Sequence, residues 1–584
     1  MIIFTALGII SSVFQLSVLR EFSFSIAKNE ISLALATGMW IFFCALGSII
    51  KTGKKQLSYA FPFFTSLIFI ISISLIHLAR PIMRVAYYES ISAISTLVLS
   101  LLLIGPIAFI IGHALKRLAM NFSESASAQN GPDIRLLAFE AMGFLIGGLS
   151  FTFYLNNCPN PMFFAILPVI LAVPVKPAAK KILCALGISF LTVISALSFG
   201  LIIRAEFGNP PSISRISSRY SPLVLTSSDK TSSLFYAGGL LATSEDKQAN
   251  EEFIHMGVAG CATAKNKKAL FIGPAVSGQL NELNKYGFTQ IDFVQIDPLL
   301  TDIAKRHAVI KTQGEINFFT ADPRLFLTLK KRKYDVIMMN MPAPSSLGLN
   351  RFFTVEFFKI ISKSLNNDGT FSFAIPSKRE ILSPQFIRFN SSIINAVRKV
   401  FPETILIPSD YMTVIASNNK TLKDTDLLLN FRSSGIKNDF FTFYHFRDYL
   451  DPPMRAYIEK MIDKTIPANT DLNPSGFLNY LWLEQSKFYL NLRIGPEKIK
   501  TLVLILTAIS LTALAIINTA SKKYSCFLNT SFAGFTAINA NLMTLFLFQI
   551  YCGELFWKLG VFLSLFMASL SAGTLALNKA AKGQ

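Results

Sequence analysis

Residues 269–280 read ALFIGPAVSGQL, a short apolar run that ends at a glycine turn and leads into a polar stretch. An apolar run of this length beside glycine is typical of a buried strand, so we predict a strand at 269–273. Similar runs predict further strands at 290–297, 316–322, 334–340 and 370–375, with helical segments between them, for example at 298–307 and 354–365. This alternation predicts a doubly wound parallel sheet, which binds ligands outside the carboxyl ends of its strands.

Four successive segments of this region resemble the polyamine aminopropyltransferases, the spermidine and spermine synthases. They are ALFIGPAVSGQL at 269–280, FVQIDPLLTDIAKRH at 293–307, FFTADPRLFL at 318–327 and YDVIMMNMPAPSSLGLNRFFTVEFF at 334–358. The resemblance spans residues 219–418 and implies a Rossmann-like fold of the S-adenosylmethionine methyltransferase type. It also implies decarboxylated S-adenosylmethionine or a related nucleoside as one ligand and a polyamine as the other.

Flanking segments resemble the membrane-bound, spermidine-synthase-like branch of the same family. They are QLSVLREFSFSIAKNE at 15–30, FEAMGFLIGGLSFTF at 139–153 and NLMTLFLFQIYCGELFWKLGVFLSLFMASLSAGT at 541–574. We therefore expect a multi-pass α-helical membrane protein with an inserted α/β domain, and the lipid bilayer as one partner.

The glycine turn after the first predicted strand carries the first candidate ligand residues, Gly273 and Gly278. In the family such a turn lets the backbone approach the nucleoside, because a side chain would block that approach. Here proline, alanine and valine stand at 274–276, where the resemblance leads us to expect glycine or aspartate. An ordinary tight turn between strand and helix explains the two glycines equally well.

The ends of the second and third predicted strands supply three more candidates, Gln295, Asp297 and Asp322. Gln295 stands where the family has an acidic residue that holds the ribose hydroxyls, and an amide lacks the charge-assisted strength of a carboxylate. By resemblance, Asp322 contacts the adenine. Both aspartates precede a proline that can open a helix, so helix capping is the alternative role.

The loop after the fourth predicted strand departs furthest from the family. Aminopropyl transfer requires a base, and the family provides aspartates here in a pattern like Asp-x-x-Asp-Pro. This sequence has Asn340 and Ala343 at those positions, and neither side chain accepts a proton at neutral pH. Asp335 begins the strand, so we expect it at the opposite edge of the sheet. Glu356 lies on the following helix, where a solvated or capping role is favoured.

Weaker candidates lie outside these four segments. His255 precedes the first strand, in a region where the family contacts its ligands, but a lone histidine is more often structural. The polar turn 469–471 is expected to be a loop or a helix cap. The six cysteines include no CxxC pair, so we expect neither a zinc site nor disulfides, and no other metal-ligand cluster stands out.

Composition indicates a membrane protein, with 52% hydrophobic and only 15% charged residues. Apolar stretches long enough to cross a bilayer predict seven spans before the α/β region and three after it. They lie at 1–19, 31–50, 57–79, 90–115, 136–156, 159–175, 182–203, 501–521, 528–549 and 555–577, of which 159–175 is the shortest. The predicted domains are therefore 1–204, 205–500 and 501–584.

Five polar residues within these spans are candidates for a solute path: Glu140, Gln15, Asn539, Asn541 and Gln549. A carboxylate inside a bilayer is costly unless it is paired or hydrated. The alternative is that these side chains form hydrogen bonds between helices and hold the bundle together.

The net charge of +20 reflects lysine and arginine beside the spans and on the solvated surface, so we expect no nucleic-acid partner. With seven spans, one set of short segments carries the basic clusters at 51–55, 116–117, 135, 176–181, 522–523 and 579–582. The other set carries Arg20, Lys28, Arg80, Arg84 and Lys558. Basic short segments face the cytoplasm, which predicts a plasma (inner) membrane protein with an extracytoplasmic α/β domain. One consideration favours a cytoplasmic domain instead, because the family's ligands are cytoplasmic metabolites. Omitting the span at 159–175 would also put the domain inside, but the charge rule disfavours that arrangement.

Three functions remain open from the sequence. The first is a divergent aminopropyltransferase with a non-standard base. The second, which the changes at Gln295, Asn340 and Ala343 favour, is a non-catalytic module that binds a nucleoside or polyamine. The third is a transporter or sensor built on the helical bundle. The sequence leaves the ligand and a homo-oligomeric state undetermined.

Overall fold

The computed structural model describes most of the chain, and its contacts divide the described residues into two compact units. The first comprises Met1–Leu241, Asn539–Leu545 and Glu554–Gln584, and the second Ala242–Ile538 and Phe546–Gly553. Residues described are those from 2 to 582 apart from 28, 51–59, 88, 126–133, 173–177, 219, 229–230, 237–238, 262–266, 309–313, 420–421, 489–500, 502–504, 506, 510, 513–514, 517–521 and 554.

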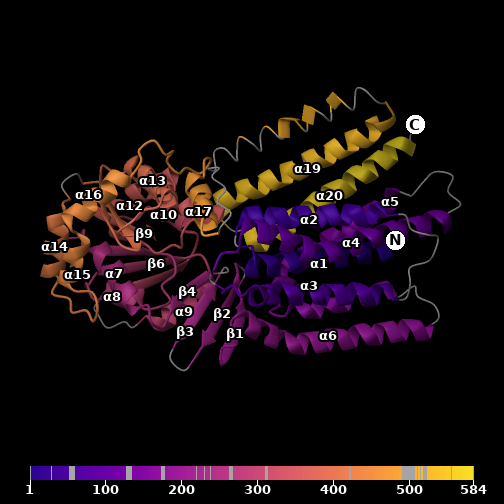
Figure 1. Ribbon diagram of the computed structural model, residues 1–584, viewed down its shortest axis with the longest axis horizontal. Helices are drawn as coiled ribbons and strands as arrows, with labels where there is room; N and C mark the ends of the chain where they lie inside the picture. Colours follow the sequence, from indigo (N-terminus) through magenta and orange to yellow (C-terminus); the bar gives the residue numbers. More distant parts are fainter. Residues whose placement is uncertain are drawn as a thin grey trace. The chain divides into compact units, whose positions relative to one another are not determined.

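The first unit, here called the helical unit, consists largely of long apolar helices (Figure 1). They are α1 (Ile2–Ser25), α2 (Glu30–Ile49), α3 (Phe61–Met83), α4 (Ala93–Ser125), α5 (Ile134–Phe153), α6 (Ala178–Glu206) and α20 (Leu555–Lys582). Two short 3₁₀ helices, η1 (Leu155–Asn157) and η2 (Pro161–Ala172), connect α5 to α6. Across the described part of the chain, seven helices are long and apolar enough to cross a membrane, the seventh being Phe532–Cys552 within α19 (Lys522–Cys552).

Glycines allow the helices of this unit to pack closely. A Cβ added at Gly8 of α1 would collide with the Glu140 carbonyl oxygen of α5, and one at Gly143 of α5 would collide with that of Thr5. Gly112 of α4 lies equally close to the backbone of α2 at Cys44. Such close backbone approach is the usual way in which apolar helices associate without a buried polar core.

The carboxyl ends of α1, α3, α5 and α6 meet at one end of the helical unit. Arg20 near the end of α1 donates to the Asn156 carbonyl oxygen just after α5, at 2.8 Å. His77 near the end of α3 lies 2.7 Å from Glu206, the last residue of α6. Because the end of α5 lies near the end of α6, the segment that connects α5 to α6 has to run back to the opposite end of the unit, where α6 begins.

This return path contains the stretch predicted as the sixth span, 159–175. Within it η2 is only 12 residues long, shorter than the neighbouring helices. It nevertheless runs beside α6, because Asn160 donates to the Ala196 carbonyl oxygen and Ala172 packs near Cys184. The predicted span at 501–521 lies largely outside the described residues.

A four-stranded antiparallel sheet follows α6, with the strand order β1-β2-β3-β4. Its strands are β1 (Ser212–Ser217), β2 (Pro222–Ser227), β3 (Ser232–Tyr236) and β4 (Gly239–Thr243). Val224 and Phe235 of this sheet form an apolar cluster with Phe24 and Tyr87, which lie near the ends of α1 and α3. This packing explains why the helical unit continues to Leu241, beyond the predicted boundary at residue 205.

The second unit contains a seven-stranded sheet with the order β10-β11-β9-β8-β5-β6-β7. The strands are β5 (Lys268–Ile272), β6 (Gln290–Gln295), β7 (Glu315–Thr320), β8 (Tyr334–Met339), β9 (Leu365–Pro376), β10 (Glu403–Ile407) and β11 (Tyr411–Ser417). The pairs formed by β5 through β9 are parallel, and β11 pairs antiparallel with β9 and β10. The five predicted strands and their parallel arrangement are confirmed, and the strand order is that of the S-adenosylmethionine methyltransferase type.

Helices cover both faces of this sheet. They are α7 (Lys247–Val258), α8 (Gln279–Asn284), α9 (Pro298–His307), α10 (Pro323–Lys330), α11 (Leu347–Asn350), α12 (Val355–Ser364) and α13 (Pro384–Arg398), with η3 (Arg351–Phe353). Toward the carboxyl end follow α14 (Asp424–Ser433), α15 (Phe443–Tyr449), α16 (Pro452–Met461) and α17 (Ser475–Gln485). Asp297 and Asp322 cap α9 and α10, each with a proline at the first helical position, which fixes where these helices begin.

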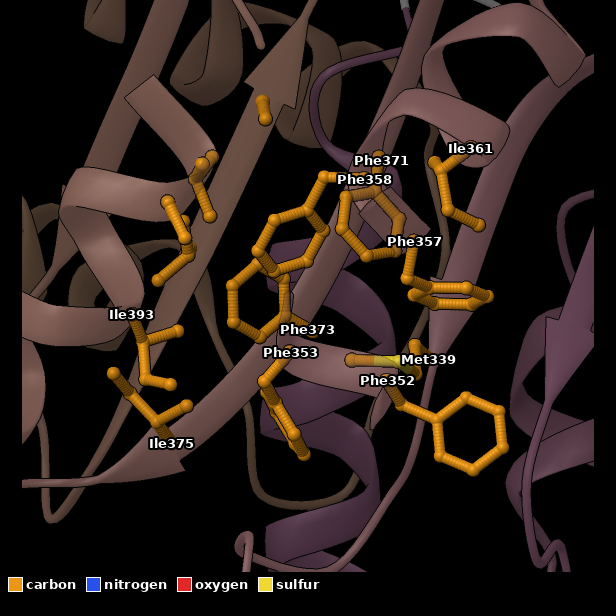
Figure 2. Close-up of a cluster of buried hydrophobic side chains, with 14 of the residues drawn as sticks. Met339, Phe352, Phe353, Phe357, Phe358, Ile361, Phe371, Phe373, Ile375 and Ile393 are labelled. Atoms are coloured by element: carbon orange, nitrogen blue, oxygen red, sulfur yellow. The ribbon is translucent and has the colours of Figure 1, made fainter. Parts of the chain in front are cut away.

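Alternate residues of each central strand serve opposite faces. On β5, Phe271 packs in the cluster with α7, α8 and α9, whereas Ile272 packs in the cluster with α10, α12 and α13. Figure 2 shows the aromatic centre of the second cluster, where Phe373 stacks with both Phe358 and Phe371 beside Met339. Burial on both faces explains why these strands read as continuous apolar runs in the sequence.

The last two turns of α19 belong to the second unit. Phe546 and Ile550 pack against Leu347 of α11 and Phe477 of α17. The predicted carboxyl-terminal domain 501–584 is therefore divided between the two units by contacts.

Candidate functional site

The expected ligand crevice lies between β5 and β8, the neighbouring strands at which the order of the parallel sheet reverses. The carboxyl ends of β5, β6, β7 and β8 bring four predicted site residues to this edge: Gly273, Gln295, Asp322 and Asn340. Asp335 lies at the opposite edge, as expected, where it accepts from the Lys268 amide and from Asn366.

Gly273 has a φ of 103°, a conformation that favours glycine. A Cβ at this position would also collide with the Asn340 carbonyl oxygen. The requirement for glycine thus comes from contact between β5 and β8 themselves. Gly278, with a φ of 96°, begins α8 and meets only the Asn281 amide within 4 Å of an added Cβ.

Asn340 braces the glycine turn. Its backbone amide continues the parallel ladder by donating to the Ile272 carbonyl oxygen at 2.8 Å. Its side-chain Nδ2 donates to the Pro274 carbonyl oxygen, also at 2.8 Å. An aspartate could not make the second bond, because a carboxylate has no proton to donate. The side chain at the family's base position is therefore a donor that holds the loop.

Other polar side chains also bind the loop backbone. Asn250 of α7, which sequence reasoning did not single out, donates to the Ser277 carbonyl oxygen at 2.8 Å and contacts its hydroxyl at 3.2 Å. Gln279 accepts from the Ser277 amide and donates to its hydroxyl. The loop is thus held by protein groups from two helices.

The second strand ends in two buried side chains that bind neighbouring backbone amides. Gln295 is 4% exposed, and its Oε1 accepts from the Ile296 amide at 2.6 Å. Asp297 is fully buried and accepts from the Leu299 amide at 2.9 Å as the cap of α9. Capping, the alternative role considered for Asp297, is the one seen in this geometry. Ligand binding by either residue stays a prediction.

Asp322 is engaged twice. It caps α10 by accepting from the Arg324 and Leu325 amides, and it forms an ion pair with Arg351. Arg351 is 3% exposed and donates its other terminal nitrogen to the Tyr551 carbonyl oxygen at 2.8 Å. Burial lowers the pKa of the Arg351 guanidinium, and the Asp322 carboxylate partly opposes that shift. The side chain predicted to contact adenine is thus neutralised within the protein.

A second buried pair joins distant parts of the chain beside Asp322. Arg324 donates to both carboxylate oxygens of Asp471, at 2.8 and 2.7 Å, and the Thr354 hydroxyl donates to the same carboxylate at 2.8 Å. Glu356 accepts from the Asp471 amide at 3.0 Å. The polar turn 469–471 and Glu356 therefore hold the loop after β8 in place.

His255 lies away from the strand edge. It is fully buried on α7, with Nδ1 2.8 Å from the Tyr286 hydroxyl and Nε2 3.2 Å from Glu282. Burial would raise the pKa of the Glu282 carboxyl, but its bonds to His255 and Lys285 outweigh burial and lower it. Both imidazole nitrogens are occupied by protein groups, which is the geometry of a structural histidine. The predicted ligand role of His255 is not tested by this placement.

Three of the polar residues predicted within spans lie on three different helices. Gln15 of α1 is buried, and Glu140 of α5 is partly buried. Gln549 of α19 lies in the second unit, where its amide abuts Gly348. In the described parts of the chain, no three His, Cys, Asp or Glu side chains gather as metal ligands.

Comparison with known proteins identifies the central part of the chain. Residues 248–426 match the family described as the spermine/spermidine synthase domain. Polyamine aminopropyltransferase 2 of Aquifex aeolicus (strain VF5) is 27% identical over 205 residues, covering 32% of this chain and 40% of its own. The polyamine aminopropyltransferase of Oceanobacillus iheyensis is 25% identical over 283 residues, covering 44% of this chain and 55% of its own. The chain thus spans about half the length of these two relatives.

A solved structure, the spermidine synthase from Thermotoga maritima, aligns over 43% of this chain and 87% of its own, with 18% identity and a TM-score of 0.35. The matched residues 248–426 include the four segments whose resemblance to the synthases was noted, and they contain the β5–β8 edge described above. Through residues 248–426 the chain is therefore similar to the spermidine and spermine synthases.

Proposed function

We propose that this chain is a membrane-embedded, spermidine-synthase-like protein whose α/β domain binds a nucleoside or polyamine without conventional aminopropyl transfer. The single observation that carries the proposal is the bond from Asn340 Nδ2 to the Pro274 carbonyl oxygen. The position that holds a base in the family here holds a donor that is committed to the backbone.

The chemistry explains why this matters. In aminopropyl transfer, an amine nitrogen attacks a carbon bound to a sulfonium, the carbon–sulfur bond breaks, and the amine must lose a proton. A polyamine amine is mostly protonated at neutral pH, so the reaction depends on a nearby group that accepts the proton. Asn340 and Ala343 cannot accept it. Asp322, Asp471 and Glu356 are carboxylates, but each already accepts hydrogen bonds from the protein.

An active aminopropyltransferase with a non-standard base is the second candidate. The names of the Aquifex and Oceanobacillus relatives favour it, since both are polyamine aminopropyltransferases. In this alternative, a carboxylate such as Asp322 would have to exchange Arg351 for the substrate during the reaction.

We place the helices in a lipid bilayer, with the α/β domain outside the cytoplasm. Seven apolar helices of sufficient length support insertion. The meeting of the carboxyl ends of α1, α3, α5 and α6 supports seven passes before β1. Lys116, which donates to the carbonyl oxygens of Ile49 and Ile50, lies at the other end, as do the basic residues at the start of α6. The basic end should face the cytoplasm.

The test uses the full chain purified in detergent. Formation of spermidine from putrescine and decarboxylated S-adenosylmethionine is measured by chromatography, and binding of adenosine, S-adenosylmethionine, putrescine and spermidine is measured by calorimetry. We expect binding of at least one of these compounds and a turnover at least about 10²-fold below that of a soluble synthase assayed in parallel. Turnover equal to that of the soluble enzyme would overturn the proposal in favour of the active transferase.

A further inference from the structure

A cluster of buried ionisable side chains joins three helix ends of the helical unit. Glu21 lies in the last turns of α1, His77 near the end of α3, and Glu206 at the end of α6. Glu21 and His77 are fully buried, and Glu206 is 4% exposed. Ionisable side chains are rarely buried in apolar helical bundles unless they have a function, so the arrangement requires an explanation.

His77 lies between the two carboxylates. Its Nδ1 is 2.7 Å from Glu206 Oε2 with hydrogen-bond geometry, and its Nε2 is 3.2 Å from Glu21 Oε2, at ion-pair distance without hydrogen-bond geometry. The imidazole ring also packs edge to face with the ring of Phe199 of α6. The imidazole thus has an anionic oxygen on each side.

The other charges around His77 are unevenly distributed. Arg20 donates two bonds to Glu21 Oε1, at 2.9 and 2.7 Å, and Arg215 of β1 donates to Glu21 Oε2 at 2.7 Å. Arg80 of α3 binds the carbonyl oxygens of Ser25 and Ala86. Of the other helices that pack on α3, η2 carries no titratable residue, and α4 carries none between Ala93 and Gly112.

His77 is in direct ion-pair contact with Glu206, and Arg80 interacts with the same carboxylate electrostatically without an ion-pair contact. The position of Glu206 at the carboxyl end of α6 places a negative charge at the negative end of the helix dipole, which is unfavourable unless a cation is close. A neutral imidazole carries one N–H and one lone pair, so with both carboxylates ionised one ring nitrogen would direct its lone pair at a carboxylate. One additional proton removes both unfavourable interactions, the uncompensated charge at the end of α6 and the lone pair directed at a carboxylate.

We propose that Glu21, His77 and Glu206 form a proton-binding site of the helical unit. Compared with the state in which His77 is neutral and both carboxylates are ionised, the site holds one additional proton. Several buried polar atoms around it have no protein partner: Glu206 Oε1, Arg215 Nε, Arg215 Nη1 and Arg80 Nη2. Buried polar atoms of this kind bind water in protein interiors, and water gives a proton a route to and from the site. Arg215 connects the site to the β1–β4 sheet, so occupancy by the proton reaches beyond the helices.

The experiment uses the full chain in detergent, labelled with ¹⁵N-histidine. The sequence has five histidines, and a variant with His113, His307 and His445 replaced leaves His77 and His255 to be told apart by a further His255→Asn change. Nitrogen chemical shifts distinguish an imidazolium from a neutral imidazole, and infrared spectroscopy detects a protonated carboxyl group. At pH 7.5 we expect an imidazolium signal from His77 and its loss in Glu206→Gln.

The matched control is Glu89→Gln, which removes an exposed carboxylate near the end of α3 and should leave the His77 signal unchanged. A neutral His77 in the unsubstituted protein, with no protonated carboxyl band, would overturn the proposal. This outcome can be read without any variant of Glu206, so the test holds even if Glu206→Gln does not fold. An imidazolium signal that persists in Glu206→Gln would also overturn it, because Glu21 already has two arginine partners.

Discussion

Arg351 forms a buried ion pair with Asp322, the side chain that the family resemblance assigns to adenine recognition. A Cβ added at Gly553, just after α19, would collide with the same guanidinium, and Tyr551 accepts from it. Asp322 is therefore held by residues that come from the far end of the chain. Any ligand that needs this carboxylate has to displace Arg351.

Replacing Arg351 with methionine should therefore have two effects. Removing one partner of a buried pair leaves a buried charge and costs about 3 kcal/mol of stability. The same change frees Asp322, so the affinity for adenosine should rise. The matched control is Arg324→Met, which breaks the pair with Asp471 and the bond to the Arg351 carbonyl oxygen but keeps the Arg351 side chain. Calorimetry with adenosine on both variants checks this, and equal affinities would show that Arg351 does not occupy the nucleoside position.

The loop after β8 can be tested by restoring the family's acids. Asn340→Asp together with Ala343→Asp should raise residual aminopropyl transfer, because a positioned base contributes about 10²–10⁴-fold. Asn340→Asp alone should lower the melting temperature, since the carboxylate faces the Pro274 carbonyl oxygen without a proton to donate. Asn340→Ala serves as the control, because it loses the bond without adding a base. No gain in spermidine formation from the double variant would mean that the site lacks more than its base.

Substitutions at Gly273 and Gly435 can distinguish the effect of a steric collision from that of backbone strain. Both have a positive φ, 103° and 63°, but an added Cβ meets the Asn340 carbonyl only at Gly273 and nothing within 4 Å at Gly435. Gly435→Ala should therefore cost about 1 kcal/mol, the strain of a left-handed residue. Gly273→Ala should cost clearly more, and thermal unfolding of the two variants measures the difference. Equal losses would contradict the close contact between β5 and β8.

Asp292 should make the stability of the second unit depend on acid. It is fully buried, and although burial raises its pKa, hydrogen bonds from Tyr334, Gln290, Arg332 and Asn317 outweigh burial and lower the pKa. An unfolded aspartate has a pKa of about 3.9, so the stabilisation is complete above that pH and is lost as the pH falls through the lower folded value.

Asp292→Asn should therefore reduce the stability that is lost as the pH falls below about 4, the pKa of an unfolded aspartate. The same change should lower the stability near neutrality by about 1–3 kcal/mol. Asp410→Asn, at an exposed ion pair with Lys378, is the control and should leave the pH dependence intact. Unfolding curves of the three proteins, measured from about pH 3, one unit below the unfolded pKa, up to about pH 7, check this prediction.

The orientation of the chain can be read with reporters fused after Phe207, at the end of α6. We expect active alkaline phosphatase and dark green fluorescent protein, because the basic short segments should face the cytoplasm and leave β1 on the opposite side. A fusion after Ile50, at the basic end of α2, is the control and should give the reverse pair of signals. Fluorescence from the Phe207 fusion would place the α/β domain in the cytoplasm.

The central sheet was predictable because its strands are buried on both faces. Phe271 and Ile272 serve opposite clusters, so the whole strand must be apolar and stands out from its polar surroundings. The strands β1 to β4 were not predicted. Residues of β1, SISRIS, alternate between exposed and half-buried positions and carry little apolar signal.

The candidate site was predictable only at single positions. The loss of a base at Asn340 is visible in the sequence, but its bond to Pro274 depends on how β5 and β8 pair. The pairing of Arg324 with Asp471 joins residues 147 positions apart, and no local pattern marks it.

The buried cluster of the helical unit was missed for a different reason. Arg20 and Arg80 stand at the ends of apolar runs and were counted as charges of short loops, whereas both are buried, 5% and 0% exposed. A charge beside an apolar run looks the same in the sequence whether it faces solvent or a carboxylate of another helix. Removing these two arginines from the loop count makes the charge asymmetry between the two ends larger.

The attachment of the last turns of α19 to the second unit affects how the α/β domain can be prepared for study. Leu347 and Phe477 are buried against Phe546 and Ile550, which are separated from them in the sequence by another predicted membrane span. A fragment that stops before residue 500 would expose this apolar surface and release Arg351 from Tyr551. Ligand affinities measured on such an excised fragment would describe an altered pocket edge, so the intact chain, or a fusion that supplies residues 546–553, is the appropriate material.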